Sequence, residues 1–214
     1  MTKKSHTIIL AGLDGSGKTT QSKKLIEYLE SNKLNCHYVW LRYPFRLIIP
    51  FVIFLRLFNL SAYPLTIEKK KRGIKNLENH RTLSKIWKNI LYLDLKIDYN
   101  KKVKNYLKKN VFVVLDRSII DTIVDLEMIT GSHGNLKNYL SEFLTLLPKN
   151  HSIFFLDIPS TLSFERNGDE DHESLSLRRE LYLKVCDILQ IKKIDGTKSI
   201  DDIHMRIISE IDTI

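Results

Sequence analysis

The chain has 214 residues, of which 43% are hydrophobic and 28% charged, a balance typical of a globular protein and not of a disordered one. This length predicts one domain with one hydrophobic core. No secretory signal pattern opens the chain, and its two cysteines form no spacing motif, so we expect a cytoplasmic protein.

The net charge of +9 is concentrated in one stretch. Between residues 68 and 110 there are fourteen Lys or Arg against four acids. Such an excess is compatible with an anionic substrate, RNA or an anionic membrane surface, and equally with a solvated helix face.

The first motif is a phosphate-binding loop between a strand and a helix. Residues 12–19 match the pattern G-x-x-x-x-G-K-[ST], four apolar residues precede them, and a helical pattern follows. Backbone amides of such a loop point at phosphate oxygens, Lys18 would reach the β and γ phosphates, and the Thr19 hydroxyl would hold Mg²⁺. The residues expected to bind ATP in this loop are Gly12, Leu13, Asp14, Gly15, Ser16, Gly17, Lys18, Thr19 and Thr20.

A second strand is predicted at residues 35–41. The strand–helix–strand unit implies parallel strands joined by a right-handed crossover. Arg42 follows the strand directly, at the sheet edge where open α/β proteins bind their ligands.

The most apolar segment of the chain spans residues 45–65. Its longest charge-free run, residues 47–55, includes Pro50 and has about half of the roughly 20 residues that a spanning helix needs. It is therefore not a predicted transmembrane helix. Burial against the core or a dimer partner, and an interfacial position on an anionic membrane, both stay open.

The second half of the chain continues the alternation of helices and strands. Residues 82–109 are predicted as a helix that places Tyr92 and Lys96 on one face. The further expected elements are a buried strand at 111–115, helices at about 119–129 and 136–147, a strand at 152–156, helices from 160 and at 175–189, a strand at 191–195, and a last helix with a capping box at Ser199 and Asp202. Five strands alternating with helices predict a three-layer α/β fold, with a doubly wound parallel five-stranded sheet of the P-loop NTP hydrolase type.

Missing motifs separate the classes of phosphate-loop proteins. No Asn-Lys-x-Asp segment is present to read guanine, and no second acid follows Asp116 or Asp157 to activate water. A kinase of a small metabolite instead needs cations around the acceptor and a mobile cover. Arg42 and Arg117 would clamp an acceptor phosphate, with surface salt bridges as the alternative, and the polar residues 167–173 would be the cover.

Six segments together resemble the thymidylate kinase family. They are Gly12-Leu-Asp-Gly-Ser-Gly-Lys-Thr-Thr-Gln21, Arg42-Tyr-Pro44, Leu115-Asp-Arg117, Phe155-Leu-Asp-Ile-Pro159, Glu165-Arg166 and Asp195-Gly-Thr-Lys-Ser-Ile-Asp-Asp202. Their order and spacing agree with the family over residues 5–44 and 88–214, roughly three quarters of the chain.

The resemblance implies that ATP donates its γ phosphoryl group, with Mg²⁺, to a nucleoside monophosphate, and most simply converts dTMP to dTDP. The implied catalytic residues are Asp14, Lys18, Asp116 and Arg117, and the implied ligand of adenine is Arg166. For the acceptor it implies Arg42 and Arg117 on the phosphate. Counted back from Asp116, the base-stacking position falls on Tyr92 and the thymine-reading position on Lys96.

Three departures from the family stand out. Lysine at position 96 lacks the planar fork of arginine, whereas the tyrosine at 92 keeps a stacking ring. The family takes a transition-state arginine from the loop position held here by Gly15 or from the cover, but residues 167–174 contain four acids and no Arg or Lys. Either Arg166, Arg178 or Arg179 replaces it, or the enzyme is slow. The third departure is the apolar segment after the second strand.

We therefore expect a single kinase domain over residues 1–214, with an apolar and basic helical insert at about 45–81 and a short lid at about 166–174. The expected partners are nucleotide substrates, and the resemblance implies a homodimer; we expect no specific nucleic acid. Two alternatives stay open: a kinase of a nucleoside or another small acceptor, since residues 116–118 also resemble deoxynucleoside kinases, and a non-catalytic nucleotide-binding protein weakly associated with an anionic membrane surface.

Overall fold

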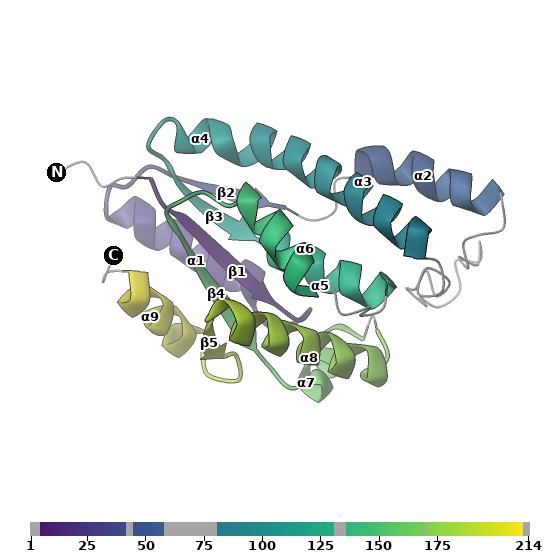
Figure 1. The fold of residues 1–214 in the computed structure, drawn as a ribbon. Coiled ribbons are helices and arrows are strands. Elements are labelled where there is room, and N and C mark those ends of the chain that lie inside the picture. The colour runs from purple at the N-terminus through teal and green to yellow at the C-terminus, as the bar shows by residue number, and fades with distance from the viewer. Residues whose placement is uncertain (1–4, 42–44, 58–80, 131–135, 169, 212–214) are drawn as a thin grey trace.

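A five-stranded sheet forms the centre of the computed structural model, which describes residues 5–41, 45–57, 81–130, 136–168 and 170–211 (Figure 1). The strands are β1 (Thr7–Gly12), β2 (Cys36–Trp40), β3 (Phe112–Asp116), β4 (His151–Asp157) and β5 (Lys192–Asp195). Their order across the sheet is β2-β3-β1-β4-β5, and every neighbouring pair is parallel. Strands are added on both sides of β1, so the sheet is doubly wound, which confirms the predicted fold class.

Helices cover both faces of this sheet and complete three layers (Figure 1). On one face lie α1 (Lys18–Ser31) and α9 (Ile200–Ile211), and on the other lie α3 (Arg81–Tyr99), α5 (Ile119–Thr130), α6 (Leu136–Phe143) and α8 (His172–Leu189). The remaining helices are α2 (Phe45–Leu57), α4 (Asn105–Leu107) and α7 (Ser160–Asn167). The carboxyl ends of all five strands therefore meet at one edge between the two helical layers.

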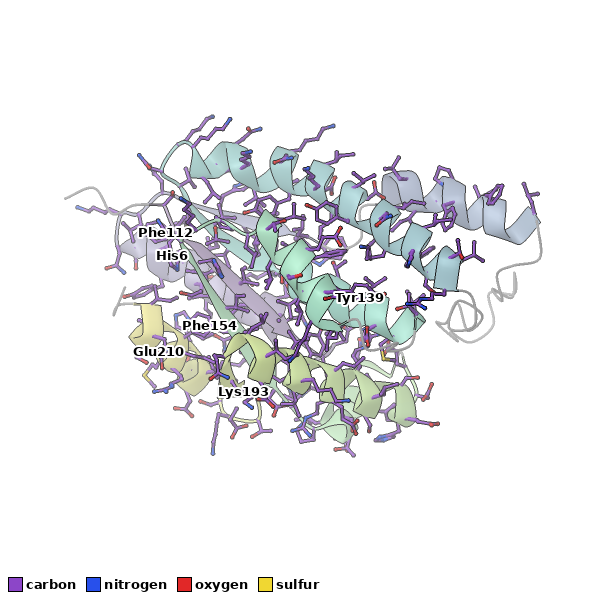
Figure 2. All side chains as sticks on the ribbon, in the orientation of Figure 1. His6, Phe112, Tyr139, Phe154, Lys193 and Glu210 are labelled. Atoms are coloured by element: carbon purple, nitrogen blue, oxygen red, sulfur yellow. The ribbon has the colours of Figure 1, made fainter. Side chains whose placement is uncertain are left out.

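The central strand shows why the sequence carries continuous apolar runs. Ile8 and Leu10 belong to the cluster beneath α1 and α9, whereas Ile9 belongs to the cluster beneath α3, α5 and α8, and all three are fully buried. Phe112 and Phe154, labelled in Figure 2, lie in the first of these clusters. A strand buried on both faces needs apolar residues at every position instead of at alternate ones.

The predicted helix over residues 82–109 is one continuous helical stretch. It consists of α3, a π-helical segment at Asn100–Lys104, and α4. Trp87, Leu91 and Leu95 are buried at four-residue steps, which is the periodicity seen in the sequence.

The described part of the apolar insert is the helix α2, which packs against α3. The carboxylate of Asp94, fully buried in α3, accepts hydrogen bonds from the backbone amides of Leu47 (3.0 Å) and Ile48 (3.3 Å) in the first turn of α2. These amides have no partner within the helix itself, so Asp94 caps α2 and ties it to α3. Residues 58–80 of the insert lie outside the described residues.

Several described side chains of α2 are apolar and exposed. Ile48 is buried, but four side chains are about half exposed or more, namely Ile49, Ile53, Phe54 and Leu57. Within the described ranges, none of the helices combines the length and apolar character needed to cross a bilayer.

Candidate active site

The loop that follows β1 has a backbone that only glycine adopts easily. Gly12 has φ +151°, and a Cβ there would lie 2.7 Å from the carbonyl oxygen of Leu156. Gly15 has φ +79°, and a Cβ there would lie 2.9 Å from the Cβ of Arg166. Both positions combine a positive φ with a close neighbour, which explains the first glycine of the motif, Gly12, and the additional glycine at position 15.

Lys18 is held inside this loop at the start of α1. Its side chain is buried, and its Nζ donates hydrogen bonds to the carbonyl oxygens of Gly12 (2.8 Å) and Leu13 (2.6 Å). The same Nζ lies 4.0 Å from the Asp14 carboxylate. The ammonium is therefore held at the backbone of the loop in which the motif predicts that it reaches the β and γ phosphates.

The next residue of the loop reaches the end of β3. The hydroxyl of Thr19 donates a 2.6 Å hydrogen bond to Oδ2 of Asp116, which is 1% exposed. Because Mg²⁺ prefers oxygen ligands, a hydroxyl beside a carboxylate at a phosphate loop fits the metal expected from the sequence. Thr19 and Asp116 are the residues that would hold it.

A third side chain at this point was missed by the sequence reasoning. The Tyr38 hydroxyl, from β2, donates a 3.0 Å hydrogen bond to the same Oδ2 of Asp116. Burial and then the negative charge of Asp116 raise the pKa of Tyr38, so the phenol stays protonated and remains a donor. A tyrosine in a strand looks like an ordinary β-former, and only the pairing of β2 with β3 reveals the contact.

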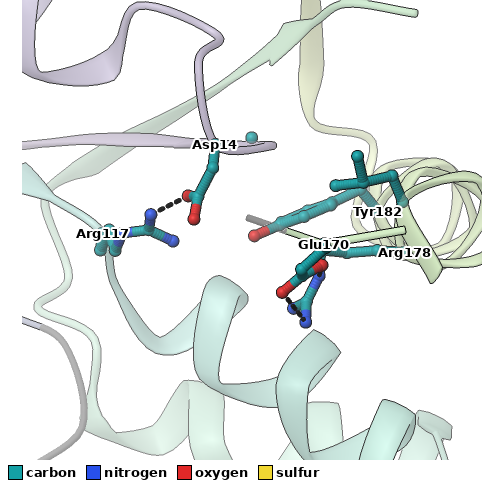
Figure 3. Close-up of a pocket in the computed structure, with 7 residues that line it drawn as sticks. Asp14, Arg117, Glu170, Arg178 and Tyr182 are labelled. Carbon is teal, nitrogen blue, oxygen red and sulfur yellow. Dashed lines mark hydrogen bonds and ion pairs between the residues drawn. The ribbon is translucent and has the colours of Figure 1, made fainter. Parts of the chain in front are cut away.

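Arg117 forms an ion pair with Asp14 of the loop (Figure 3). Its backbone is left-handed, with φ +65°, at the point where β3 ends. The hydroxyl of Ser163 in α7 donates a 2.7 Å hydrogen bond to the carbonyl of Asp14, and the Arg166 guanidinium donates a 2.9 Å bond to the carbonyl of Gly15. The structure thus brings Asp14, Arg117 and Arg166 together around the loop, and the roles that the resemblance implies for them stay predictions.

A small pocket opens between the loop, β3 and α8. Its lining residues are Gly12, Asp14, Arg117, Glu170, Leu175, Arg178 and Tyr182. Figure 3 shows Asp14 and Arg117 on one side of the pocket and Glu170, Arg178 and Tyr182 on the other. The pocket is therefore bordered by an arginine on each side, with each of the two paired to an acid.

Arg178, on the α8 side of the pocket, is paired with two acidic side chains. Arg178 forms an ion pair with Asp125 of α5, and its Nε and Nη2 each donate a 3.1 Å hydrogen bond to the carboxylate of Glu170. Burial acts to lower the pKa of Arg178, but the charges of Asp125 and Glu170 outweigh it and raise the pKa above its usual value. Arg178 therefore stays charged beside the phosphate loop.

Arg179, the third candidate, pairs with an acid that does not line the pocket. Arg179 donates hydrogen bonds of 2.8 and 2.9 Å to the carboxylate of Asp157, at the end of β4. Of the candidates to replace the family's transition-state arginine, Arg166 contacts the loop and Arg178 lines the pocket, whereas Arg179 is held at Asp157.

Of the residues expected to bind the acceptor, Arg117 lines this pocket, whereas Tyr92 and Lys96 are not among its lining residues. Arg42 lies outside the described residues. The Tyr92 hydroxyl lies 3.3 Å from that of Thr145, its ring meets the ring of Phe143 edge-on at 5.3 Å, and the Lys96 ammonium lies 5.9 Å from the centre of the same tyrosine ring. Tyr92 and Lys96 thus share a face as predicted, and their contact with an acceptor stays a prediction.

Sequence relatives of the chain are thymidylate kinases. The thymidylate kinase of Plasmodium falciparum (isolate 3D7) is 25% identical over 219 residues, covering 98% of this chain and 90% of that protein. The thymidylate kinase of Thermosipho africanus is 26% identical over 210 residues, covering 94% of each chain. No family model matches the chain.

A solved structure of thymidylate kinase from Ehrlichia chaffeensis has a similar fold. It superimposes with a TM-score of 0.58 over 97% of this chain and 99% of that chain, at 19% sequence identity. The likeness at this identity shows the shared P-loop fold. The sequence relatives, together with the phosphate loop and the strand-end Asp116 and Arg117, show that this chain is similar to thymidylate kinases over most of its length and support its being a kinase.

Proposed function

We propose that the chain transfers the γ phosphoryl group of ATP to a nucleoside monophosphate and that dTMP is its preferred acceptor. The observation that carries the proposal is the double link between the loop and the end of β3. Thr19 is bonded to Asp116, and Asp14 is paired with Arg117. Asp116 and Arg117, neighbours at the end of β3, are thus both tied to the part of the chain that would bind ATP. The Arg117 guanidinium is a cation suited to binding a second phosphate there.

The donor side would act by position and charge. The loop amides and Lys18 would bind the β and γ phosphates. The fixed ammonium of Lys18 would then stabilise the negative charge that develops on these phosphates during the transfer. When bound, Mg²⁺ neutralises phosphate charge and draws the two phosphates together. Asp116 would keep the Thr19 hydroxyl turned so that its oxygen is available to the metal.

The acceptor side would use the arginines that border the pocket. Asp14 holds the Arg117 guanidinium beside the loop, where it would bind the acceptor phosphate next to the γ phosphate. Arg178 lies across the pocket and would supply the cation that the cover itself lacks. We take residues 166–174 as a lid that would exclude water when both nucleotides are bound.

The choice of dTMP rests on the thymidylate kinases among the relatives and on Tyr92. An aromatic ring at this position would stack on a base, and Lys96 on the same helix face would donate one hydrogen bond to it. A lysine is a point donor, so we expect weaker discrimination among bases than an arginine would give.

A panel of acceptors tests this proposal. ADP release would be measured with dTMP, dUMP, dCMP, dGMP, thymidine and no acceptor, using the parent and Lys18→Ala. We expect the fastest acceptor-dependent release with dTMP and a loss of at least about 10²-fold in Lys18→Ala. Turnover with thymidine alone would favour the nucleoside-kinase alternative. Release that depends on no acceptor, or a fully active Lys18→Ala, would contradict the proposal.

We infer that the chain forms the homodimer that the resemblance to the family implies, and we propose that the exposed apolar side chains of α2 form its interface. The half-exposed Ile53 and Phe54 support this inference, because water-exposed aliphatic and aromatic side chains gain most from such burial. Sedimentation of the parent and of the double variant Ile53→Glu, Phe54→Glu tests it. We expect the parent to be a dimer and the double variant to be a monomer. A parent that is monomeric and that floats with anionic liposomes at low salt would favour the membrane alternative.

A further inference from the structure

We infer that Tyr38 is a positioning residue for the magnesium site and that it acts through Asp116. The inference rests on the proposed function, because it concerns the metal that accompanies ATP. Nothing in the phosphate-loop motif points to this residue, which belongs to the edge strand β2 and not to the loop or to β3.

The strand pairing explains how Tyr38 reaches the site. Tyr38 pairs with Val114, and Trp40 pairs with Asp116, in the parallel register of β2 and β3. Residues two apart on a strand point to the same face, so Tyr38, Val114 and Asp116 share one face of the sheet. Val114 belongs to the cluster beneath α1, the helix that carries Thr19. The tyrosine ring extends along the strand direction until its hydroxyl meets the carboxylate two positions further on.

Two hydroxyl groups from different elements converge on one oxygen atom. Thr19 donates at 2.6 Å and Tyr38 at 3.0 Å, and both bonds end on Oδ2 of Asp116. Because a carboxylate turns freely about its last side-chain bond, one donor alone would leave its plane loosely defined. The second donor fixes the plane of Asp116, which in turn fixes the direction of the Thr19 proton.

This arrangement has a chemical consequence for the metal. The Thr19 hydroxyl has a single proton, and this proton is directed at Asp116, so the lone pairs of its oxygen are left for a cation. Groups that orient a metal ligand in this way typically change metal affinity by about 10–100-fold when removed.

The decisive variant is Tyr38→Phe, which keeps the ring and removes the hydroxyl. The affinity of Mn²⁺ for the enzyme–ADP complex would be measured by electron paramagnetic resonance, with ADP affinity measured separately without metal. We expect Mn²⁺ to bind at least about tenfold more weakly in Tyr38→Phe, with metal-free ADP affinity unchanged. The Mg²⁺ concentration for half-maximal turnover should rise in parallel.

Tyr106→Phe is the matched control. The Tyr106 ring stacks on His37 with 3.8 Å between ring centres, and His37 lies next to Tyr38 on β2 but points to the other face. Removing this hydroxyl changes the same region of the protein without touching Asp116, so metal affinity should not change. If Tyr38→Phe is too unstable to purify, Tyr38→Met removes the hydroxyl with a flexible apolar side chain.

A double variant separates positioning from a general structural effect. When Asp116→Asn is already present, Tyr38→Phe should cause little further loss of Mn²⁺ affinity, because its effect is exerted through the carboxylate. An unchanged Mn²⁺ affinity in Tyr38→Phe, or an equal loss whether or not Asp116→Asn is present, would overturn the inference alone. A parent protein that binds neither ADP nor Mn²⁺–ADP would instead contradict the proposed function.

Discussion

Arg178 and Glu170 are joined by two hydrogen bonds of 3.1 Å, donated by Nε and Nη2 of the guanidinium to the two carboxylate oxygens. This is the geometry in which an arginine binds a phosphate, with a side-chain carboxylate in the same position. Arg178 and Glu170 both line the pocket with Arg117, so a phosphate bound there could take the place of the Glu170 carboxylate on this guanidinium.

We predict from this geometry that Arg178→Lys lowers kcat by at least about 10-fold and leaves the KM for ATP within a few-fold of the parent. Lysine keeps the charge but loses the fork, and an arginine at the transition state can contribute roughly 10³ to 10⁵ in rate. Steady-state kinetics with dTMP at saturation would measure the change. Arg179→Lys is the control, because Arg179 pairs with Asp157 outside the pocket; an equal loss in both variants would contradict a special role for Arg178.

A second prediction concerns base recognition on α3. Lys96→Arg restores a planar fork beside Tyr92, so the ratio of kcat/KM for dTMP to that for dCMP should rise several-fold. Competition between the two acceptors in one reaction measures this ratio directly. Lys88→Arg, whose lysine pairs with Glu142 on α6, changes the same residue type nearby and should leave the ratio as it is. A ratio unchanged in Lys96→Arg would exclude Lys96 from base recognition.

A third prediction follows from the capping of α2 by Asp94. Asp94→Ala removes the acceptor of two backbone amides in the first turn of α2, and a lost cap typically costs about 0.5–2 kcal/mol. The free energy of unfolding, measured in urea, should fall by about this amount, and amide exchange in residues 47–57 should accelerate. Asp98→Ala, which removes the partner of Lys102 on the same helix, is the comparison; faster exchange of α2 amides in that variant as well would argue against the specific cap.

The fourth prediction concerns pH. His6 is buried against Ser152, with 2.9 Å between Nε2 and Oγ, and burial followed by the charge of His151 lowers its pKa below 6.5. The unfolded chain thus binds a proton at a higher pH than the folded chain does, so stability is full above about pH 6.5 and falls as the pH drops toward the lowered value.

Urea unfolding of the parent, His6→Gln and His172→Gln at pH 7.5 and 5.5 checks this prediction. The loss of stability between the two pH values should be smaller in His6→Gln than in the parent and unchanged in His172→Gln, whose histidine is exposed. Some loss should remain in His6→Gln, because burial also lowers the pKa of His204. Equal losses in all three proteins would contradict the role given to His6.

The sequence was sufficient for the fold because its local patterns agree with one another. Continuous apolar runs predicted strands buried on both faces, and the glycine spacing placed the phosphate loop between β1 and α1. The cap of the last helix by Ser199 is also confirmed, since its hydroxyl accepts a 3.1 Å hydrogen bond from the amide of Asp202; the Asp202 carboxylate in turn accepts a 2.7 Å bond from this hydroxyl, and not the backbone bond of a capping box. The π-helical segment at Asn100–Lys104 was not predicted, because such segments are rare and short and no residue type in this stretch marks the change to i→i+5 hydrogen bonds.

The parts of the site that were missed depend on tertiary packing. Tyr38 meets Asp116 only because β2 pairs with β3 in one register, and a shift of one residue would turn the tyrosine to the other face. The sequence indicated Arg178 as one of three candidates to replace the family's transition-state arginine, but it did not reveal the acids that pair with Arg178. Asp125 and Glu170 come from α5 and from the segment before α8, and no local spacing connects them.

Arg117 has a left-handed backbone, which a residue with a Cβ adopts at a cost of roughly 1–2 kcal/mol and glycine adopts freely. Selection for thermal resistance alone would thus favour glycine at this position, whereas selection for turnover would retain the guanidinium. The two selections should therefore favour different residues at position 117. In a library of variants at this position, glycine should rank above arginine when survival of heating is scored, and arginine above glycine when growth is scored.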